Sequence, residues 1–474
     1  MLFNSLPFLF AFLPLTLLVY WRVAVRRESW RLWWLTLASY AFYAAWNVRF
    51  LPLIVGSTLV DYLVGPRIYN ARSLRTRRAW LSMSIVSNLG ALAVFKYYNF
   101  AAGQLNIAGH WLALPDLLPV LNVTLPIGIS FTAFESLSYT IDLYRGRIEP
   151  AKRFVSIAAF VAVFPRMIAG PIIRFANFAP QLARDPRRRD RLADLVAGMQ
   201  FFVLGLAKKV LIADLLGESV DVFLASKQYP HLGLVGAWLV MLGYSYQLYF
   251  DFSGYSDMAV GLGRWLGLDL PQNFRSPYKA VSCADFWRRW HMTLSAWLRD
   301  YLYVPLGGSR GSRLATYRNI MVTMALGGLW HGANWVFVLW GVFHGVLLAG
   351  ERAMTSVTMS RVVGLRSANA AARMVTFALV VVGWAIFRSE NVAMAGSLIA
   401  AMFGLGGWGL SFLSTGTTPF VVLVGGAALV AHAAPDTWDI SLPPALRTAF
   451  ALGALAALCV LCLSKASPFL YFQF

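Results

Sequence analysis

Two histidines in otherwise apolar surroundings are the first candidates for chemistry. His291 lies in "FWRRWHMTLSAW" and His331 lies in "GGLWHGANW". Imidazole is the side chain best suited to proton transfer near neutral pH, and ionisable groups beside apolar spans usually serve a function. His331 follows Gly327 and Gly328 and precedes Gly332, where a helix can thin or break. The two histidines are therefore the candidates for a proton-transfer site.

Other combinations of residues are weaker candidates. His344 follows His331 by thirteen residues, and on one continuous helix that is a rise of about 20 Å, so the two rings cannot act on one group. We expect His344 to be a buried, hydrogen-bonded core histidine. Ser295 shares a helix face with His291 but has no G-x-S-x-G elbow around it, which favours a structural serine. A zinc site on His291 and His331 lacks a third ligand at zinc-like spacing, so we predict no metal.

The composition indicates a polytopic membrane protein. Of the 474 residues, 58% are hydrophobic and 13% charged, with 18 Trp, 19 Tyr and 33 Phe, whereas soluble proteins carry about twice that charged fraction. The net charge of +20 lies mostly in short loops between apolar stretches, where it sets orientation and meets anionic lipid, so we predict no nucleic-acid partner. Three cysteines cannot form a disulfide framework, and Cys459 and Cys462 are expected to pack in the core.

The apolar stretches set out the elements that must position the histidines. The first, 5–20, has its basic residues after it, which predicts a retained span with the N-terminus outside. Basic loops alternate with a loop at 103–124 that has no Lys or Arg. Further spans are expected at 32–46, 49–65, 80–100, 125–144, 195–215, 233–250, 320–330, 335–348, 374–387, 393–412, 419–433 and 449–463.

This alternation fails at one place. The apolar stretch 154–173 is followed by the strongly basic segment "RFANFAPQLARDPRRRDR". If the stretch crossed the membrane, the basic loop would lie outside. Pro165, Gly170 and Pro171 interrupt it, and such breaks survive at membrane depth only where protein or a wet cavity receives the freed backbone groups. We therefore predict a re-entrant or bent segment, with the basic loop in the cytoplasm.

The motifs around the two histidines resemble those of the membrane-bound O-acyltransferase (MBOAT) family. "FWRRWHMTLSAWLRDYLYVPLGG", "LGGLWHGANW", "YFDFSGYSDMA" and the N-terminal "MLFNSLPFLFAFLPL" are most similar to the bacterial branch that acetylates alginate, with its cellulose-acetylating relatives. The resemblance implies an all-α fold of about eleven transmembrane helices with re-entrant pieces around a tunnel. It implies one membrane domain over 1–474, with N-terminal helices at 1–150, a catalytic core at about 154–350 and C-terminal helices at 370–465.

The resemblance also implies an activity. Such proteins take acetyl from a cytoplasmic donor, expected to be acetyl-CoA with an acetylated carrier as the alternative, and pass it across the bacterial inner membrane to an exported polysaccharide such as alginate or cellulose. No separate soluble domain is visible, which implies a periplasmic or membrane-anchored acetyltransferase as partner. The family's near-invariant histidine falls on His331 and its second on His291. No permanently bound cofactor is expected.

A thioester is already activated, so the reaction needs a base and a donor for the oxyanion. We assign His331 as the general base. His291 would orient the acceptor, polarise the carbonyl or protonate the leaving thiolate. Residues expected around them, as ring-orienting or tunnel-lining groups, are Asp251, Arg299, Asp300, Trp330 and Asn334. In the basic loop, attraction of the donor's phosphates and plain control of topology stay open as roles for Arg184, Arg187, Arg188 and Arg189.

Three alternatives are kept. The chain could be a D-alanyl, lipid or protein acyltransferase of the same family. It could be a transporter, although that would call for paired broken helices in two related halves, and only one broken region is clear. It could also be a structural subunit of a polysaccharide export complex.

Overall fold

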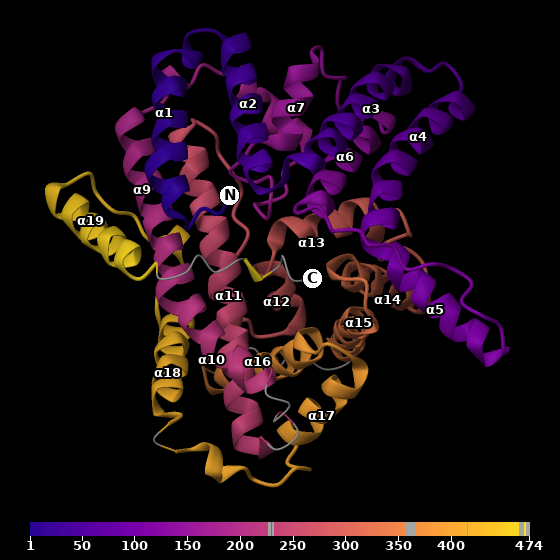
Figure 1. Ribbon diagram of the computed structural model, residues 1–474, viewed down its shortest axis with the longest axis vertical. Helices are drawn as coiled ribbons and strands as arrows, with labels where there is room; N and C mark the ends of the chain where they lie inside the picture. Colours follow the sequence, from indigo (N-terminus) through magenta and orange to yellow (C-terminus); the bar gives the residue numbers. More distant parts are fainter. Residues whose placement is uncertain (226–228, 230–231, 356–365, 415, 464–468, 471–474) are drawn as a thin grey trace. The chain divides into compact units, whose positions relative to one another are not determined.

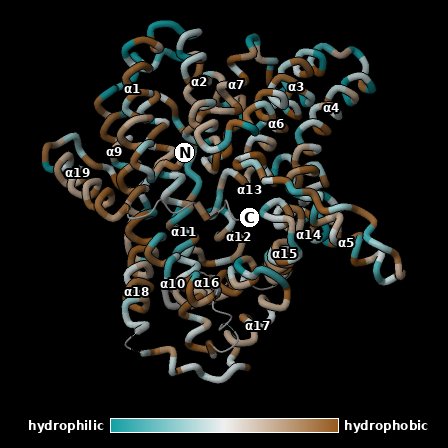
Figure 2. Tube along the Cα trace, viewed as in Figure 1, coloured by the Kyte–Doolittle hydropathy of each residue, from teal (hydrophilic) through white to brown (hydrophobic). Residues whose placement is uncertain are grey.

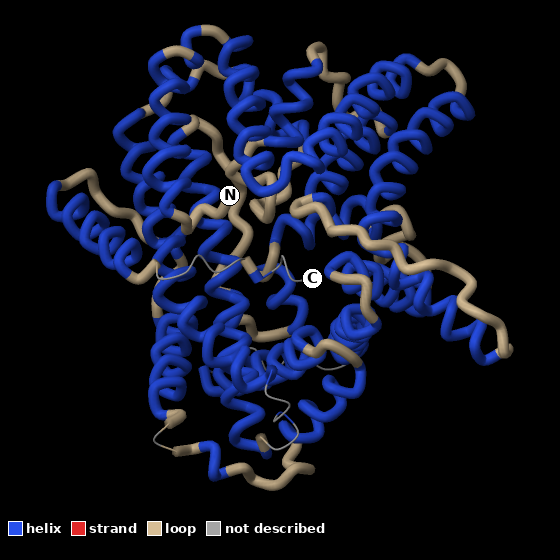
Figure 3. Tube along the Cα trace, in the orientation of Figure 1, coloured by secondary structure: helices blue, strands red, loops and turns tan. Residues whose placement is uncertain are grey.

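The computed structural model describes residues 1–225, 229, 232–355, 366–414, 416–463 and 469–470. Within these residues every regular element is a helix, as Figure 3 shows. The predicted all-α fold is therefore confirmed. The chain forms two compact units. Unit 1 comprises Met1–Phe202, Met258–Pro271 and Pro443–Leu446, and unit 2 comprises Val203–Asp257, Gln272–Leu442 and Arg447–Phe474.

Unit 1 is built mainly from the N-terminal helices. The junction between the spans predicted at 32–46 and 49–65 forms as a short 3-10 helix, Val48–Phe50, in which the Asn47 side chain accepts from the Arg49 N–H. The span predicted to end at Phe100 is longer, since its second helix continues to Trp111. The helices are α1 (Leu13–Arg22), α2 (Glu28–Asn47), α3 (Leu51–Asn70), α4 (Leu74–Leu92), α5 (Tyr98–Trp111), α6 (Ile129–Tyr144), α7 (Phe154–Ala162), α8 (Phe175–Ala183) and the first part of α9 (Arg191–Ala207).

Two arginines of unit 1 bind carbonyl groups near the ends of neighbouring helices. The Arg31 guanidinium, in the first turn of α2, donates to the Leu182 carbonyl near the end of α8. Arg77 Nη2, in the first turn of α4, donates to the Leu143 carbonyl near the end of α6 at 3.0 Å. Figure 2 shows the α1–α2 and α3–α4 loops as hydrophilic turns between hydrophobic helices.

The interrupted stretch after α6 is bent, as predicted. Helix α7 ends at Ala162 after nine residues, a rise of about 14 Å, which is too short to cross a bilayer core of about 30 Å. The backbone is then irregular until α8, and the segment is buried in protein. Phe164 N–H donates to Ser39 Oγ at 2.9 Å, and the buried Arg166 guanidinium pairs with Glu135 on α6. Protein groups thus receive the freed polar atoms.

Unit 2 holds most of the remaining helices, whereas the last turns of α11, from Met258, belong to unit 1. Helix α11 is longer than the span predicted at 233–250, because it continues through the polar stretch after Phe250 to Trp265. The span expected at 393–412 is wrong in its second half, because the helix ends at Met402 and Gly404 and Gly407 then take left-handed backbone angles. The helices are α10 (Asp214–Ala225), α11 (Gly233–Trp265), α12 (Cys283–Arg289), α13 (Met292–Leu298), α14 (Arg313–His331), α15 (Trp335–Thr355), α16 (Arg366–Arg388), α17 (Val392–Met402), α18 (Thr418–Ala433) and α19 (Leu446–Leu461).

Six helical segments among the described residues are long and apolar enough to cross a membrane. Three of them, Glu28–Asn70, Leu74–Trp111 and Arg191–Leu224, each join two successive α-helices. Three further apolar helices, α17, α18 and α19, are shorter. The chain is thus a multi-pass membrane protein, whereas the expected total of about eleven spans stays a prediction. Residues 464 and 465, at the end of the predicted C-terminal helices, lie outside the described residues.

Helices α14 and α15 form a tight hairpin that presents His331. They lie side by side in Figure 1. A Cβ on Gly328 would lie 2.1 Å from the Phe337 carbonyl oxygen, and one on Gly341 would lie 2.2 Å from the Met324 carbonyl oxygen. The two backbones therefore touch at positions where only glycine fits. This contact fixes the end of α14, where His331 is the last helical residue.

Candidate active site

His331 lies in a box of aromatic rings in unit 2. Its side chain is buried, and its ring centroid is 5.0 Å from that of Trp330, 5.1 Å from Trp340 on α15 and 5.4 Å from Phe387 on α16. The predicted break is present, because α14 ends at His331 and Gly332 is extended. Three helices therefore hold the imidazole in surroundings that exclude water. Electrostatic interactions with a reacting group are strong in such surroundings.

His291 lies between the short helices α12 and α13 and is fully buried. Its backbone is left-handed, with φ 41° and ψ 54°, a conformation that is uncommon outside glycine and that collects at functional sites. Its ring packs edge-on against Phe252 of α11, with centroids 4.7 Å apart. The unusual backbone angle is what turns this side chain into the core.

Asn273 fixes the tautomer of His291. Asn273 Oδ1 lies 3.0 Å from His291 Nδ1 and also accepts from the Thr293 backbone N–H at 3.3 Å and the Thr293 hydroxyl at 2.9 Å. A backbone N–H can only donate, so the amide oxygen must face this side, and His291 Nδ1 must carry the proton. Asn273 Nδ2 is held in turn by Ser256 Oγ at 3.2 Å. His291 Nε2 therefore carries the lone pair and is an acceptor.

The protonation state of His291 agrees with this geometry. Burial lowers the pKa of its imidazole to about 3, because a charged ring is disfavoured where water is absent. The ring is therefore neutral at physiological pH. With Nδ1–H committed to Asn273, His291 can accept a hydrogen bond through Nε2 but is poorly suited to deliver a proton.

Trp330 links the two histidines. Its ring centroid is 6.4 Å from that of His291 and 5.0 Å from that of His331. The imidazoles, forty residues apart in the sequence, are thus brought to one indole. Of the residues expected near the histidines, Trp330 is the one seen in contact with both rings.

The acidic and basic residues expected around the histidines are bound as follows. Asp251 of α11 is buried and pairs with Lys209 Nζ at 2.6 Å, while its second oxygen accepts from the Leu470 N–H at 2.9 Å. Lys209 also pairs with Asp214 at 2.7 Å. Arg299 and Asp300 bind one another, with Nε and Oδ1 2.7 Å apart. A role for Asp251, Arg299 or Asp300 in orienting either ring stays a prediction.

Asn334 and Ser295 have structural contacts. Asn334 accepts from the Val336 N–H at 3.2 Å and donates to the Glu390 carbonyl at 2.8 Å, so it ties the turn after His331 to the end of α16. The Ser295 hydroxyl donates to the Trp290 carbonyl at 3.4 Å. Ser295 and Arg299 also line a cavity of about 200 Å³ in unit 2. Trp287 forms its inner wall and packs against Trp340.

His344 is packed as predicted, but the hydrogen bonds expected of it are absent. It is fully buried, and its ring contacts Trp287, Trp340 and Phe343 at centroid distances of 5.2, 5.0 and 5.5 Å. Among the described residues neither ring nitrogen has a hydrogen-bond partner. Its neighbours are aromatic because α12, α15 and α16 each turn an aromatic face toward it.

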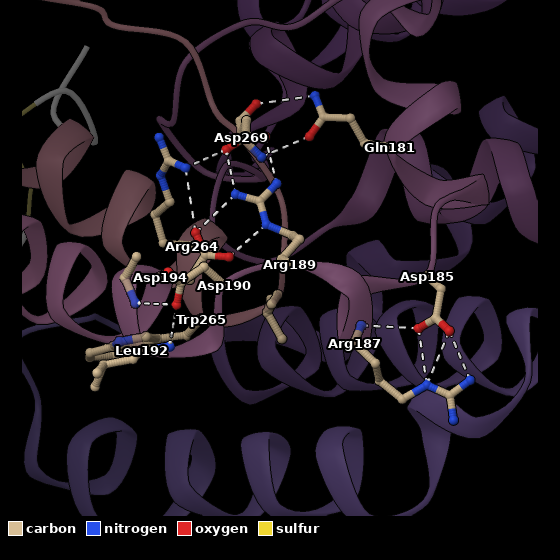
Figure 4. Close-up of polar contacts among 12 residues, drawn as sticks. Gln181, Asp185, Arg187, Arg189, Asp190, Leu192, Asp194, Arg264, Trp265 and Asp269 are labelled. Atoms are coloured by element: carbon tan, nitrogen blue, oxygen red, sulfur yellow. Dashed lines mark hydrogen bonds and ion pairs between the residues drawn. The ribbon is translucent and has the colours of Figure 1, made fainter.

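The basic loop before α9 lies in unit 1, where several of its arginines are neutralised (Figure 4). Arg187 holds Asp185 with contacts of 2.8–3.1 Å and lowers the pKa of that carboxyl to about 2. Arg189 binds Asp194 at 2.6 Å and Asp269 at 2.7 Å. Arg184 and Arg188 are exposed. Two of the four proposed donor-binding arginines are therefore already bound to carboxylates.

Sequence reasoning missed Asn273. It stands in "LPQNFRSPY", a proline-flanked polar segment, and no spacing relates it to His291. The Asn273 amide can be recognised as the partner of His291 only in the folded chain. Across the residues that the structure describes, no group of three His, Cys, Asp or Glu side chains is placed to hold a metal ion.

Comparison with known proteins identifies the family to which this chain is similar. The model of the "MBOAT, membrane-bound O-acyltransferase family" matches residues 148–394, which include both histidines. The "Probable alginate O-acetylase AlgI" of Pseudomonas aeruginosa is 47% identical over 87% of this chain and 77% of its own length. The protein of that name from Azotobacter vinelandii is 43% identical over the whole of both chains. The "Peptidoglycan O-acetyltransferase" of Helicobacter pylori is 36% identical over 89% of this chain and 83% of its own.

Proposed function

The chain belongs to the membrane-bound O-acyltransferase family and is an acyltransferase, and we propose that it transfers acetyl groups across the bacterial inner membrane for O-acetylation of an exported polysaccharide. The donor is acetyl-CoA on the cytoplasmic side. Relatives named for alginate and for peptidoglycan support a cell-envelope or exported glycan as the final acceptor. Alginate and cellulose are the acceptors to test first.

The observation that carries this proposal is the meeting of His291 and His331 at Trp330. A site for acyl transfer needs one group that removes a proton and another that holds the acceptor, within reach of one carbonyl carbon. Both imidazoles are buried, and they come from different elements of unit 2. Such convergence of two polar rings inside an aromatic wall is characteristic of a reaction site rather than of packing alone.

His331 acts as the general base. Its imidazole takes the proton from an acceptor hydroxyl while the hydroxyl oxygen attacks the thioester carbonyl carbon. The tetrahedral intermediate then collapses, the carbon–sulfur bond breaks, and the leaving thiolate takes the proton back from His331. The ester is formed, the thiol is released, and the histidine returns to its neutral state. The surrounding aromatic rings keep water away from the thioester.

His291 orients the acceptor. Because Nδ1–H is donated to Asn273, the Nε2 lone pair accepts the hydrogen bond of the acceptor hydroxyl and aims its oxygen at the carbonyl carbon. Of the three roles open to His291, this one is favoured over polarising the carbonyl, which requires a donor, and over protonating the thiolate, which requires a charged ring.

An indole is the candidate donor to the oxyanion. Trp340 packs against His331, its side chain is buried, and its Nε1–H has no acceptor among the described residues. A buried donor without an acceptor is costly unless a ligand supplies one. A tetrahedral oxyanion beside His331 would supply it.

The protein has a defined orientation in the membrane and acts with a partner. The N-terminus faces the periplasm, and the basic loops face the cytoplasm, where they meet anionic lipid. The acetyl group passes through the protein to a periplasmic or membrane-anchored acetyltransferase, which completes transfer to the polysaccharide. A D-alanyl or other acyl donor is the alternative within the family.

The test uses inverted membrane vesicles that contain the protein with its partner acetyltransferase and enclose the polysaccharide. Radiolabelled acetyl-CoA is supplied outside, and label on the enclosed polysaccharide is counted. His331→Ala should lower the rate by about 10²–10⁴-fold with unchanged protein level. His432→Gln is the matched control, because His432 of α18 bonds Tyr246 and contacts neither active-site ring in the described structure.

Acetylation that survives His331→Ala at the normal rate would overturn the assignment of the base. Label accepted from a D-alanyl carrier but not from acetyl-CoA would instead assign the alternative donor. A chain that assembles the export complex normally but transfers no acyl group from either donor would support a structural subunit.

A further inference from the structure

A groove in unit 1 lies between α1, α9 and the last turn of α11. It encloses about 470 Å³. Its walls include Leu17 and Leu195 and two tryptophans, Trp21 and Trp265. Trp21 Nε1–H donates to the Trp265 carbonyl at 3.0 Å, and Trp265 Nε1–H donates to the Leu195 carbonyl at 3.3 Å. These hydrogen bonds hold both indoles in place, so the groove is a built feature of the fold.

The apolar walls face the membrane. Leu192 and Leu195 are 58% and 54% exposed. They belong to the candidate span Arg191–Leu224, and Leu17 and Trp21 belong to the candidate span Phe8–Arg26. Exposed leucines on membrane-spanning helices meet lipid chains, and tryptophans collect where chains give way to headgroups. The groove is therefore placed at the boundary between chains and headgroups.

One positive charge at the mouth of the groove, that of Arg191, has no opposing carboxylate among the described residues. Arg189 and Arg264 are matched by Asp194 and Asp269, with contacts of 2.6–2.9 Å (Figure 4). Arg191 instead rests on the Trp21 ring, 4.6 Å from its centroid, and no carboxylate of the described residues pairs with it.

The acid next to Arg191 does not neutralise it. Asp190 Oδ1 accepts from the Leu192 and Ala193 N–H groups at 3.1 and 3.0 Å, at the start of α9. Its charge is thus balanced by the positive end of that helix. Arg264, which also lines the groove, has a buried Nε–H with no acceptor among the described residues.

We propose that this groove binds an anionic phospholipid. The phosphate group lies against Arg191 and the Nε–H of Arg264, and one acyl chain runs along Leu17, Leu192 and Leu195 between the two indoles. A basic pocket between membrane helices at their cytoplasmic end is the usual form of such a site. The acetyl donor also carries negatively charged phosphates, but it has no long acyl chains. The exposed apolar walls of the groove therefore favour the phospholipid.

The test counts lipids retained by the full-length detergent-purified protein in native mass spectrometry. Phosphatidylglycerol is titrated against phosphatidylcholine, which has the same chains and no net charge. Arg191→Gln should weaken retention of phosphatidylglycerol by about fivefold and leave phosphatidylcholine unchanged. Arg188→Gln is the matched control, because Arg188 lies in the same loop, is exposed and does not line the groove.

Equal losses in Arg191→Gln and Arg188→Gln would show diffuse surface attraction and overturn the site. A second variant, Leu195→Gln, tests the chain contact and should weaken retention of phosphatidylglycerol, whereas unchanged retention would contradict it. Glycerol phosphate, which has the headgroup charge without chains, should not displace the lipid. Displacement by coenzyme A at equal concentration would assign the groove to the donor instead.

Discussion

Asn273 accepts a hydrogen bond from His291, with Oδ1 and Nδ1 3.0 Å apart, and thereby leaves the Nε2 lone pair of the imidazole as its acceptor. Asn273→Leu removes the acceptor and frees the ring to take the other tautomer. We expect the rate of acetyl transfer to fall about 10- to 100-fold, the usual loss when a histidine loses its orienting partner. The rate should be measured with protein level and melting temperature alongside.

Asn273→Asp tests whether residue 273 acts by orienting the His291 ring or only by stabilising the fold. It retains the acceptor oxygen but adds a negative charge beside the ring, which raises the pKa of His291 from about 3. Acetyl transfer, slowed in Asn273→Leu, should recover at high pH and be lost at low pH. The acidic side of the pH–rate profile should therefore lie at higher pH than in the wild type. An unshifted profile would contradict control of the ring by residue 273.

Trp340→Phe keeps the ring packed against His331 but removes the N–H proposed to bind the oxyanion. We expect a fall of about 10²–10³-fold in kcat with little change in KM. Trp287→Phe is the comparison variant. Its buried N–H likewise has no acceptor among the described residues, but its ring contacts His344 and Trp340 rather than His331. Similar losses in both variants would argue for packing alone.

His344→Phe tests whether the third histidine is more than packing. Both ring nitrogens lack partners among the described residues, so a ring without polar atoms should keep the melting temperature at or above that of the wild type. Acetyl transfer should continue at the normal rate. His344→Ala should instead destabilise by about 3 kcal/mol, because it leaves a cavity among the tryptophans. Loss of transfer in a well-folded His344→Phe would give this residue a chemical role.

Asp269→Asn weakens the ion-pair network before α9. Hydrogen bonds from Arg189 and the charge of Arg264 hold the pKa of Asp269 below its ordinary value. A lowered pKa stabilises the fold above the ordinary value near 4, and this stabilisation is lost as the pH falls through the folded value. The variant should be less stable by about 1 kcal/mol at pH 7, and the difference in melting temperature should narrow below about pH 4. A difference in melting temperature that did not change with pH would exclude the Asp269 charge as its cause.

The sequence was sufficient for features that depend on neighbouring residues. The break at His331 follows from its flanking glycines, and the bend after α7 follows from Pro165, Gly170 and Pro171 together with the basic loop behind them. The helical class follows from the apolar stretches. The end of α17 was missed because an apolar glycine-rich stretch looks alike whether the chain continues as helix or turns.

Contacts between distant segments could not be read in the same way. Asn273 reaches His291 through a left-handed backbone angle at His291 itself, and no local pattern indicates that angle. The pairing of Asp251 with Lys209 likewise depends on how α11 packs beside the π-helical segment Lys208–Ala213, which joins α9 to α10. A buried carboxylate must have a partner, but the sequence alone offers many arginines and lysines as candidates.

The hairpin of α14 and α15 has a consequence for how the protein is made. Helix α15 is apolar enough to enter a bilayer, whereas α14, which ends in His331, is not among the six segments that qualify. A turn of three residues joins the two, and their backbones touch at Gly328 and Gly341. During biosynthesis α14 therefore depends on α15 to partition into the membrane. His331 reaches its position in the membrane only after α15 has been synthesised.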